Sequence, residues 1–319
     1  MWQIVVRIET DTGQTGWGFG GGGKAAVEIV NGHFSEILVG RPLNSISDIS
    51  EIWDYLYAES IPYGRKGIAI MALSGVDLSL YDALGKAENK PVAKLLNPIN
   101  KQTMRCYATG PDTNWYAEMG FAAQKIPHRW TGKDSTETAV SSTEAARSVL
   151  GSEAEVMLDV YMSWDADVTV HMNTALRHVG IHWFEEPVPV ESYHALQQVK
   201  ESTNVRISVG ERLHTRYEFI PIFENNLADY VMPDVTWTGG ISELKKISTM
   251  AEAYYVPVSP HDASGPINIM AGAQVSMTVP NFYKLETMRY DLSGYDCLLD
   301  NPLDIRDGNL YLSESPGLG

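Results

Sequence analysis

The sequence is poor in cysteine and in basic residues. Its 319 residues include two cysteines, Cys106 and Cys297, which are far apart and form no CxxC pair. This favours reduced thiols over a disulfide framework. Lysine and arginine number 24 against 40 aspartates and glutamates, which gives a formal net charge of −16. Such a balance argues against a nucleic acid or an anionic membrane surface as the partner.

A targeting leader and a long apolar run are also lacking. The N-terminus, Met1 to Arg7, has neither the charged start nor the apolar stretch of a signal peptide. We find no run approaching the roughly eighteen apolar residues of a membrane span. We therefore expect a cytoplasmic protein without a membrane partner. The length fits a barrel of about 250 residues plus a smaller unit.

Residues 1–100 are expected to form this smaller unit, an α+β domain. A hairpin is predicted at residues 3–18, because two alternating runs flank a turn. Apolar residues at helical spacing predict helices at 25–39, 47–59 and 68–86, with Ser47 as the cap of the second. Because the chain opens directly on a strand, we expect an N-terminal strand to be missing.

Two loops of this unit carry candidate functional features. Residues 18–23 hold five glycines in six positions, too many for a stable element. They are interpreted either as a mobile lid over a site or as a plain connector. The loop at residues 60–67 carries Tyr63 and Arg65. Arg65 either binds a substrate carboxylate or is a solvated surface arginine.

After residue 100 the pattern changes to short apolar runs alternating with helical segments. Strands are predicted at 104–109, 121–127, 156–159, 181–187, 205–211, 230–234, 256–261 and 282–286, and helices at 135–150, 192–202 and 241–254. From Asp159 to Glu286 the strand ends recur at intervals of 26, 26, 23, 27 and 25 residues. This regularity predicts βαβ units closed into a parallel barrel. Residues 309–312 are expected to pair back onto the first unit.

Three of the strand ends are acidic. Asp159 and Glu185 are 26 residues apart, as are Glu185 and Glu211. Strand ends of a (β/α) barrel meet at one face, which is where such barrels place their chemistry. Three converging carboxylates repel one another unless a hard cation such as Mg²⁺ binds them. The sequence therefore predicts a divalent metal site.

The remaining strand ends add Lys125, Asp234, His261 and Glu286. Asp234 and His261 lie on adjacent predicted strands, where a carboxylate–imidazole pair suits a general base. Glu286 could donate a hydrogen bond to developing negative charge if its pKa is raised enough to keep it protonated. A cation, a base and hydrogen-bond donors together suit abstraction of a proton α to a carboxylate.

The chain resembles the enolase superfamily, in its mandelate racemase-like group, over nearly its whole length. The segments that carry the resemblance are Gly75-Val76-Asp77-Leu78-Ser79-Leu80-Tyr81-Asp82, Leu158-Asp159, Trp183-Phe184-Glu185-Glu186-Pro187, Gly210-Glu211-Arg212, Pro233-Asp234 and Pro260-His261. The resemblance implies an α/β fold, a modified TIM barrel (β/α)7β under an α+β capping domain. It also implies Mg²⁺ on Asp159, Glu185 and Glu211, an Asp234–His261 base and Glu286 as the electrophile.

Within the group, the chain most resembles acid-sugar dehydratases of the rhamnonate type. The segments that carry this resemblance are Tyr63-Gly64-Arg65-Lys66-Gly67-Ile68, Tyr107-Ala108-Thr109-Gly110 and Asp159-Val160-Tyr161-Met162-Ser163. The resemblance implies that His261 removes the C2 proton and that the C3 hydroxyl leaves. Two departures bear on this. Racemases of the group carry a Lys-x-Lys motif on the second strand, and the corresponding residues here are Lys125-Ile126-Pro127. The second lysine, the base on the opposite face of the substrate, is lost, which argues against racemisation. Many such dehydratases carry a histidine two residues after the first metal ligand, and this position is Tyr161 here. The general acid that protonates the departing C3 hydroxyl is therefore His261, Tyr161 or His214.

Three functions are carried forward. The first is a Mg²⁺-dependent dehydratase, a hydro-lyase that converts a small acid sugar to a 2-keto-3-deoxy acid. The second is a cycloisomerase of the 3,6-anhydrogalactonate type on the same scaffold. The third is a non-catalytic binding or regulatory homologue. The expected domains are 1–100 (capping), 101–290 (barrel) and 291–319, a segment that returns to the capping domain. A homo-oligomer is expected from the resemblance.

Overall fold

The structure is a computed structural model that describes residues 2–98, 103–289, 298–300 and 302–319. Cys106 is a buried free thiol, and Cys297 lies outside the described residues. The predicted domain boundaries, at 100–101 and 290–291, also lie outside them and stay predictions.

The N-terminal unit is built on the predicted hairpin. Strands β1 (Ile4–Glu9) and β2 (Thr15–Gly20) pair antiparallel. The helical segments are α1 (Gly23–Ile29), the π-helical turn η1 (Val30–Phe34), α2 (Ser35–Leu38), α3 (Ile46–Ser60), α4 (Ile68–Ala87) and α5 (Val92–Leu95). The cap of α3 is Ser45 rather than the predicted Ser47. Ser45 forms a reciprocal capping box with Asp48, and Ser47 has no acid three residues later to complete one.

Part of the glycine-rich stretch 18–23 is regular structure, so the expectation that it forms no stable element was wrong there, whereas Gly21 and Gly22 form a bend that connects β2 to α1. Strand β2 continues through Gly20, and α1 begins at Gly23. A Cβ at Gly18 would lie 2.3 Å from the carbonyl oxygen of Gly75, so β2 packs directly on the backbone of α4. The glycines permit this close approach because they have no side chain.

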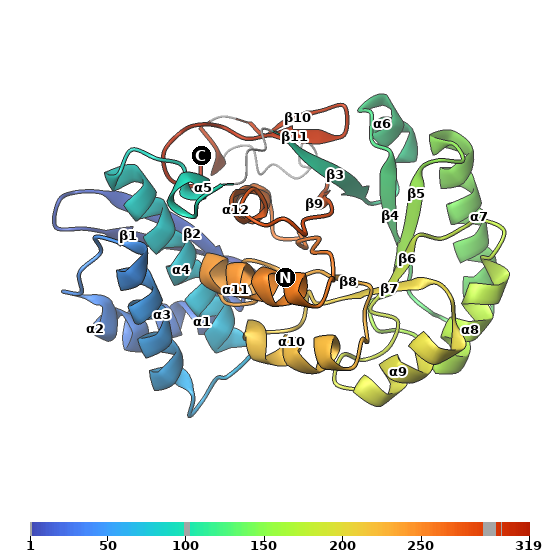
Figure 1. Ribbon diagram of the computed structural model, residues 1–319, viewed down its shortest axis with the longest axis horizontal. Coiled ribbons are helices and arrows are strands. Elements are labelled where there is room, and N and C mark those ends of the chain that lie inside the picture. Colours follow the sequence, from blue (N-terminus) through green and yellow to red (C-terminus); the bar gives the residue numbers. More distant parts are fainter. Residues whose placement is uncertain (1, 99–102, 290–297, 301) are drawn as a thin grey trace.

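The second unit is a closed parallel barrel (Figure 1). Its strands are β3 (Thr103–Thr109), β4 (Ala123–Pro127), β5 (Glu155–Asp159), β6 (Trp183–Glu185), β7 (Arg206–Val209), β8 (Tyr230–Val231) and β9 (Leu285–Thr287). Strands β3 to β8 pair in chain order, and β9 pairs with β3. Val258 closes the ring through bridges to Val231 and Phe282. The predicted strand at 256–261 forms isolated bridges only, since Pro257 and Pro260 cannot donate to a ladder.

Helices surround the barrel. They are α6 (Thr113–Glu118), α7 (Asp134–Leu150), α8 (Ala166–Ala175), α9 (Tyr193–Ser202), α10 (Thr215–Glu224), α11 (Gly240–Ala253) and α12 (Pro266–Ser276). Figure 1 shows α7, α8 and α9 along the edge away from the N-terminal unit. The sequence predicted α7, α9 and α11. Helix α12 was missed because it is mostly apolar and buried on all sides, so it has no exposed polar face to give it a period.

Successive side chains along a barrel strand point alternately to the surrounding helices and to the inside of the barrel. Leu158 and Phe184 belong to the core shared with the surrounding helices. The next residues, Asp159 and Glu185, have the opposite direction and face the barrel interior. The same holds for Ile126, a core residue, and Lys125 before it. The sheet therefore delivers charged groups to the inside at its carboxyl end.

Helix α4 joins the two units. Asp77 accepts hydrogen bonds from the backbone nitrogen of Ser242 at 3.0 Å and from its hydroxyl at 2.6 Å, at the start of α11. By length and composition α4 could cross a membrane, which corrects the expectation that no segment approaches that size. However, 89% of the relevant window is buried inside the molecule, as in the core helix of a globular protein.

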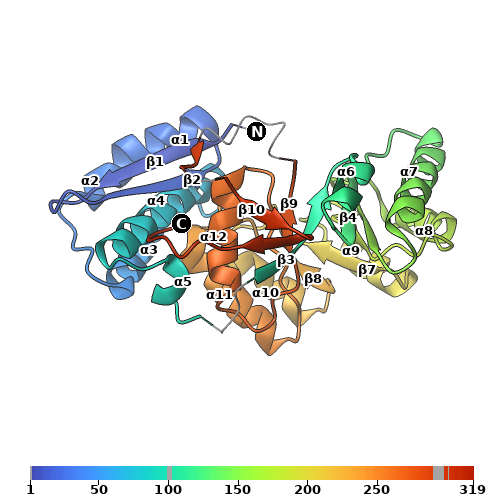
Figure 2. The same cartoon turned by 90° about the horizontal axis from the view of Figure 1, so that it is seen from above.

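The C-terminal segment pairs with the barrel. Strands β10 (Asp304–Arg306) and β11 (Asn309–Tyr311) form a hairpin, and β11 pairs antiparallel with β3 (Figure 2). The expectation that 309–312 would pair with the first unit was wrong, because Leu310 lies opposite Met104 in an apolar cluster against β3. It is Gly317 that reaches the first unit, through a bridge to Pro91.

Candidate active site

Three carboxylates meet at the carboxyl ends of adjacent strands. Asp159 ends β5, Glu185 ends β6 opposite it in the parallel register, and Glu211 follows β7 by two residues. All three are buried. One oxygen of each lies within 4.8 Å of the others. The structure therefore brings the three predicted ligands together.

The electrostatics of this triad call for a cation. Burial raises the pKa of Asp159, and it raises the pKa of Glu185 to about 8 although Lys125 opposes the shift. A dication that binds oxygen removes this cost, because it stabilises the ionised form of every ligand. A set of three buried carboxylate oxygens within 4.8 Å of one another fits Mg²⁺, which prefers oxygen ligands.

Lys125 connects the triad to Glu286. Its Nζ donates to both carboxylate oxygens of Glu185 at 2.8 Å, and it lies 2.8 Å from Oε1 of Glu286. All three side chains are 1% exposed. Burial alone would lower the pKa of Lys125, but the two glutamates raise it well above its ordinary value. Lys125 is therefore a buried ammonium that holds two carboxylates in place.

The surroundings of Glu286 lower the pKa of its carboxyl, which runs against the raised pKa that a protonated donor needs. Burial would raise its pKa, but Lys125 and His261 outweigh burial and lower it. Its oxygens also accept from the hydroxyl of Tyr107 at 3.0 Å and from the backbone nitrogen of Asp262 at 3.2 Å. A protonated Glu286 as hydrogen-bond donor is therefore not what this geometry supports, and the available donor is Lys125.

Asp234 and His261 form the expected pair. Nδ1 of His261 lies 2.8 Å from Oδ2 of Asp234, and Nε2 lies 2.9 Å from Oε2 of Glu211. Burial lowers the pKa of His261, but Glu286 and Asp234 outweigh burial and raise it to about 9. A dication beside Glu211 would act in the opposite direction, because it repels the imidazolium. The imidazole thus lies between its carboxylate partner and the triad.

The backbone next to the ligands is strained. Tyr161 and Glu186, two and one residues after the ligands Asp159 and Glu185, have φ of +52° and +42°. A non-glycine residue in this region costs about 1–3 kcal/mol and is typical of functional sites. The turn directs Glu186 to Arg212, whose Nη1 is 2.7 Å away. Glu186 is therefore paired with Arg212, while Glu185 is the glutamate that joins the triad.

Tyr161 lies at the same mouth of the barrel. Its backbone nitrogen donates to Oδ1 of Asp159 at 3.1 Å, and the guanidinium of Arg129 lies over its ring at 4.8 Å. Burial raises the pKa of the Tyr161 hydroxyl to about 12, and Asp159 adds to the shift. Tyr161 is thus next to the triad through its backbone, while its ring packs against an arginine.

The predicted substrate-binding residues Tyr63 and Arg65 line a cavity of about 550 Å³. It lies between residues 61–66 of the N-terminal unit and the beginning of α10, where Glu218 forms part of the opposite wall. The Tyr63 hydroxyl is hydrogen-bonded to His33 at 2.8 Å. His214 is buried beside this wall, with Nδ1 3.6 Å from Glu218. In the described part of the chain, none of Tyr63, Arg65 and His214 has a hydrogen bond or ion pair to the triad.

Sequence comparison decides the family. The profile described as "Mandelate racemase / muconate lactonizing enzyme, N-terminal domain" matches residues 2–97, and the one described as "Enolase C-terminal domain-like" matches residues 113–319. The chain belongs to the mandelate racemase/muconate lactonizing enzyme family. The resemblance inferred from the motifs and the modified TIM barrel with its cap are thereby confirmed.

Two curated proteins with similar sequences are dehydratases. The chain is 30% identical to an arabinonate dehydratase of Saccharolobus solfataricus, across 99% of this chain and 87% of the relative. It is also 30% identical to an L-rhamnonate dehydratase of Saccharopolyspora erythraea, across 99% of this chain and 82% of the relative.

Solved structures of the family superpose closely on the chain. A 3,6-anhydro-D-galactonate cycloisomerase from Zobellia galactanivorans gives a TM-score of 0.90 at 28% identity, across 99% of this chain and 90% of that one. A racemase from Streptomyces coelicolor A3(2), solved with bound magnesium, gives 0.89 at 26% identity, across 99% and 88%.

Several residues that donate hydrogen bonds to the site were given no role from the sequence. Tyr107 and Thr109 on β3 both donate to Glu286, and Thr236 and Asn268 both donate to Asp234. The spacing of Tyr107 and Thr109, two apart on a predicted strand, places both on the inward face and was a usable signal. Thr236 and Asn268 gave none, because they lie in a turn and on an apolar helix.

Proposed function

We propose that the chain is a Mg²⁺-dependent dehydratase of a small acid sugar. The observation that carries the proposal is the contact of 2.9 Å between Nε2 of His261, the proposed base, and Oε2 of Glu211, one of the three carboxylates of the acidic triad. The two curated dehydratases at 30% identity support the same reaction. Asp159, Glu185 and Glu211 would hold Mg²⁺, as magnesium is bound in the racemase of similar structure.

Bound Mg²⁺ would hold the substrate carboxylate and stabilise the negative charge that develops on it. The chain's own residues supply the proton transfer. Nε2 of His261 takes the proton from C2, while Asp234 holds Nδ1 and stabilises the imidazolium. Lys125 presents its ammonium to the carboxylates of the site and to charge that develops near them.

The second half of the reaction removes the C3 hydroxyl. The C2–H electron pair forms a C2–C3 double bond, the C3–O bond breaks, and the hydroxyl leaves as water after accepting a proton. The resulting enol becomes a 2-keto-3-deoxy acid. We assign this proton to His261, which has just received one. Tyr161 and His214 are the other candidates, but the Tyr161 ring packs on Arg129 and His214 lies against Glu218.

A cycloisomerase is the second candidate, supported by the structural similarity to the anhydrogalactonate enzyme. It would begin with the same proton abstraction. The leaving group would be a ring ether oxygen, which stays attached to the product. A dehydratase therefore loses water, whereas a cycloisomerase conserves mass.

Mass spectrometry of products from a library of acid sugars and anhydro acids, with MgCl₂, tests these functions. Loss of water from an aldonic acid supports the dehydratase, and an isomer of an anhydro acid supports the cycloisomerase. No conversion of either class would overturn both and leave the non-catalytic alternative.

The base is tested separately by exchange of the C2 proton in D₂O. His261→Asn should abolish exchange. His178→Asn, at a half-exposed histidine paired with Glu144, should leave it unchanged. Exchange that persists in His261→Asn would refute the assignment of the base.

Homo-oligomeric assembly and a cytoplasmic location remain part of the proposal. Light scattering on the purified chain tests the first of these, and fractionation of the cells that produce the protein tests the second.

A further inference from the structure

A chain of hydrogen bonds runs from the N-terminal unit to the Asp234–His261 pair. Nε2 of Gln3, just before β1, donates to Oγ of Ser264 at 3.0 Å. Oγ of Ser264 lies 3.1 Å from Oγ1 of Thr236, and Thr236 donates to Oδ1 of Asp234 at 2.7 Å. With the contact of 2.8 Å between Asp234 and His261, four contacts link the residue before β1 to the imidazole.

The proton positions along this chain have one consistent arrangement. The Thr236 hydroxyl donates its proton to Oδ1 of Asp234, because a carboxylate oxygen only accepts. The Thr236 oxygen is then free to accept from the Ser264 hydroxyl. The Ser264 oxygen in turn accepts from the Gln3 amide. Each hydroxyl therefore donates to the next group and accepts from the one before it. The series of hydrogen bonds has one direction, from Gln3 of the cap to the carboxylate of Asp234.

The orientation of the Asp234 carboxylate is fixed by its hydrogen-bond partners. Asp234 is fully buried. Oδ1 accepts from the nitrogen and the hydroxyl of Thr236, both at 2.7 Å. Oδ2 accepts from Nδ2 of Asn268 at 3.0 Å and faces Nδ1 of His261 at 2.8 Å. With four partners on two oxygens, the orientation of Asp234 sets the plane and the tautomer of the imidazole.

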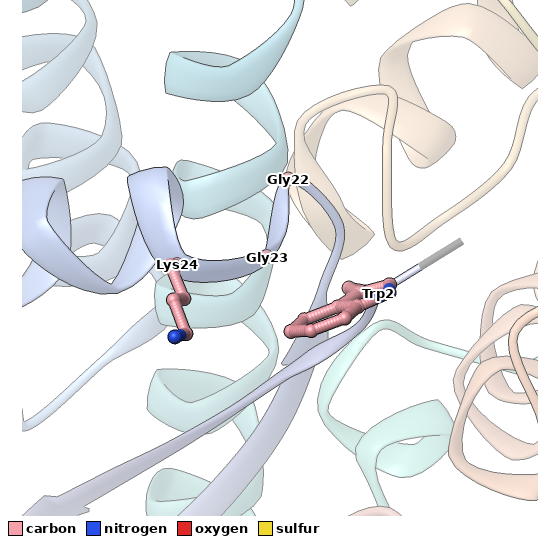
Figure 3. A pocket seen from close by; sticks show the side chains of 4 residues that line it. All are labelled: Trp2, Gly22, Gly23 and Lys24. Atoms are coloured by element: carbon pink, nitrogen blue, oxygen red, sulfur yellow. The ribbon is translucent and has the colours of Figure 1, made fainter.

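The same part of the cap also covers the imidazole. A Cβ at Gly21 would lie 3.0 Å from the ring of Trp237, and that ring lies 5.2 Å from the ring of His261. The turn that contains Gly21 is hydrogen-bonded to the segment just before β1, because the backbone nitrogen of Gly23 donates to the carbonyl oxygen of Trp2 at 3.0 Å. Figure 3 shows Trp2 beside Gly22 and Gly23, lining a cavity of about 350 Å³.

We infer that Gln3, Ser264 and Thr236 are positioning residues that align the Asp234–His261 base and make its alignment depend on the placement of the cap. The inference rests on the proposed function for its kinetic consequence. Its structural content, the order of the imidazole, is independent of the substrate.

The first test is kinetic, on a substrate found in the library. Thr236→Val keeps the shape and loses the hydroxyl, so it should lower kcat about 10- to 100-fold with KM changed less than about twofold. Thr236→Ser restores the hydroxyl and should recover kcat to within about threefold of the wild type. Thr143→Val, at a buried threonine of α7 remote from the site, is the control and should leave kcat unchanged.

A double-mutant cycle tests the link to the cap. Gln3→Leu alone should lower kcat about three- to tenfold, and it should have no further effect in the Thr236→Val background, because the path is already broken. Equal effects of Gln3→Leu in both backgrounds would overturn the inference. So would full kcat in Thr236→Val.

The second test needs no turnover. In the wild type at fixed pH, the Nδ1 proton of His261 should give a downfield NMR resonance that is lost in His261→Asn. Thr236→Val should shift or broaden it, and Thr236→Ser should preserve it. An unchanged resonance in Thr236→Val overturns the inference. Absence of turnover in the wild type, with a resonance that responds to Thr236→Val, would overturn the proposed function alone.

Discussion

Replacing Lys125 by methionine tests the electrostatic account of the site. The side chain of methionine has nearly the length of that of lysine but no charge and no donor. In the folded chain its removal leaves Glu185 and Glu286 without the ammonium that lies 2.8 Å from each. Both carboxylates are 1% exposed, so water cannot replace it.

The expected cost follows from this burial. Breaking a buried ion pair by removing one partner costs about 3–5 kcal/mol, because the other charge stays buried and unpaired. We expect Lys125→Met to lower the free energy of unfolding by this amount in EDTA. Mg²⁺ at a hundred times its Kd should stabilise the wild type by about 2.7 kcal/mol. It should stabilise the variant more, because the dication then neutralises a carboxylate that no longer has a partner.

Urea unfolding of both proteins, in EDTA and in MgCl₂, measures these differences. Lys90→Met is the matched control. It also removes a lysine 2.8 Å from a glutamate, Glu88, but both side chains are about half exposed. An exposed pair contributes about 0–1 kcal/mol. A loss below about 1 kcal/mol for Lys125→Met in EDTA, or an equal gain from Mg²⁺ in both proteins, would refute the reasoning.

Three further predictions concern packing, pH and the general acid. Gly18→Ala should lower the free energy of unfolding by about 1–3 kcal/mol, because the added methyl group meets a carbonyl oxygen of α4. Gly32→Ala is the control: open space surrounds this position, so the substitution should be neutral or slightly stabilising. Burial lowers the pKa of His182 to about 4, against about 6.5 in the unfolded chain, so the unfolded state binds more protons between these values. Stability should therefore fall by up to about 3 kcal/mol as pH falls through this range, and His182→Gln should remove that part of the slope. Tyr161→Phe should keep kcat within about tenfold, since His261 supplies the proton.

Each has a clear contrary outcome. Equal stability of Gly18→Ala and Gly32→Ala in urea would refute direct backbone packing of β2 on α4. An unchanged pH slope in His182→Gln would place the acid sensitivity elsewhere. A loss of about 100-fold or more in kcat for Tyr161→Phe, with exchange of the C2 proton retained, would assign the general acid to Tyr161.

Much of the site could be predicted because barrel chemistry follows a simple rule. Parallel strands of a closed sheet end at one face, so acids at the ends of successive strands must converge. The equal intervals from Asp159 to Glu185 and from Glu185 to Glu211 therefore predicted a cluster before any coordinates. The pairing of Asp234 with His261 follows in the same way from adjacent strand ends.

Where side chains act at long range, the sequence was insufficient. From the sequence, Glu286 could donate a hydrogen bond only if its pKa were raised enough to keep it protonated. In the structure its pKa is lowered by Lys125, which lies 161 positions earlier in the chain and is buried beside it. The glycines at 18–23 suggested loose structure by composition, whereas residues 18–20 form the end of β2, where Gly18 and Gly20 pack directly on α4. Propensity describes a residue with its neighbours in the chain and contains no term for a helix that packs against it.

The sequence by itself determined which groups reach the site, because strand period and strand ends are local properties of the chain. The tertiary structure alone decided the state in which those groups are held. Charge on Glu286, orientation of Asp234 through Thr236, and cover over His261 all depend on contacts between segments far apart in the chain. Such contacts set the dielectric and the hydrogen-bond partners of each group, and these in turn set its proton affinity.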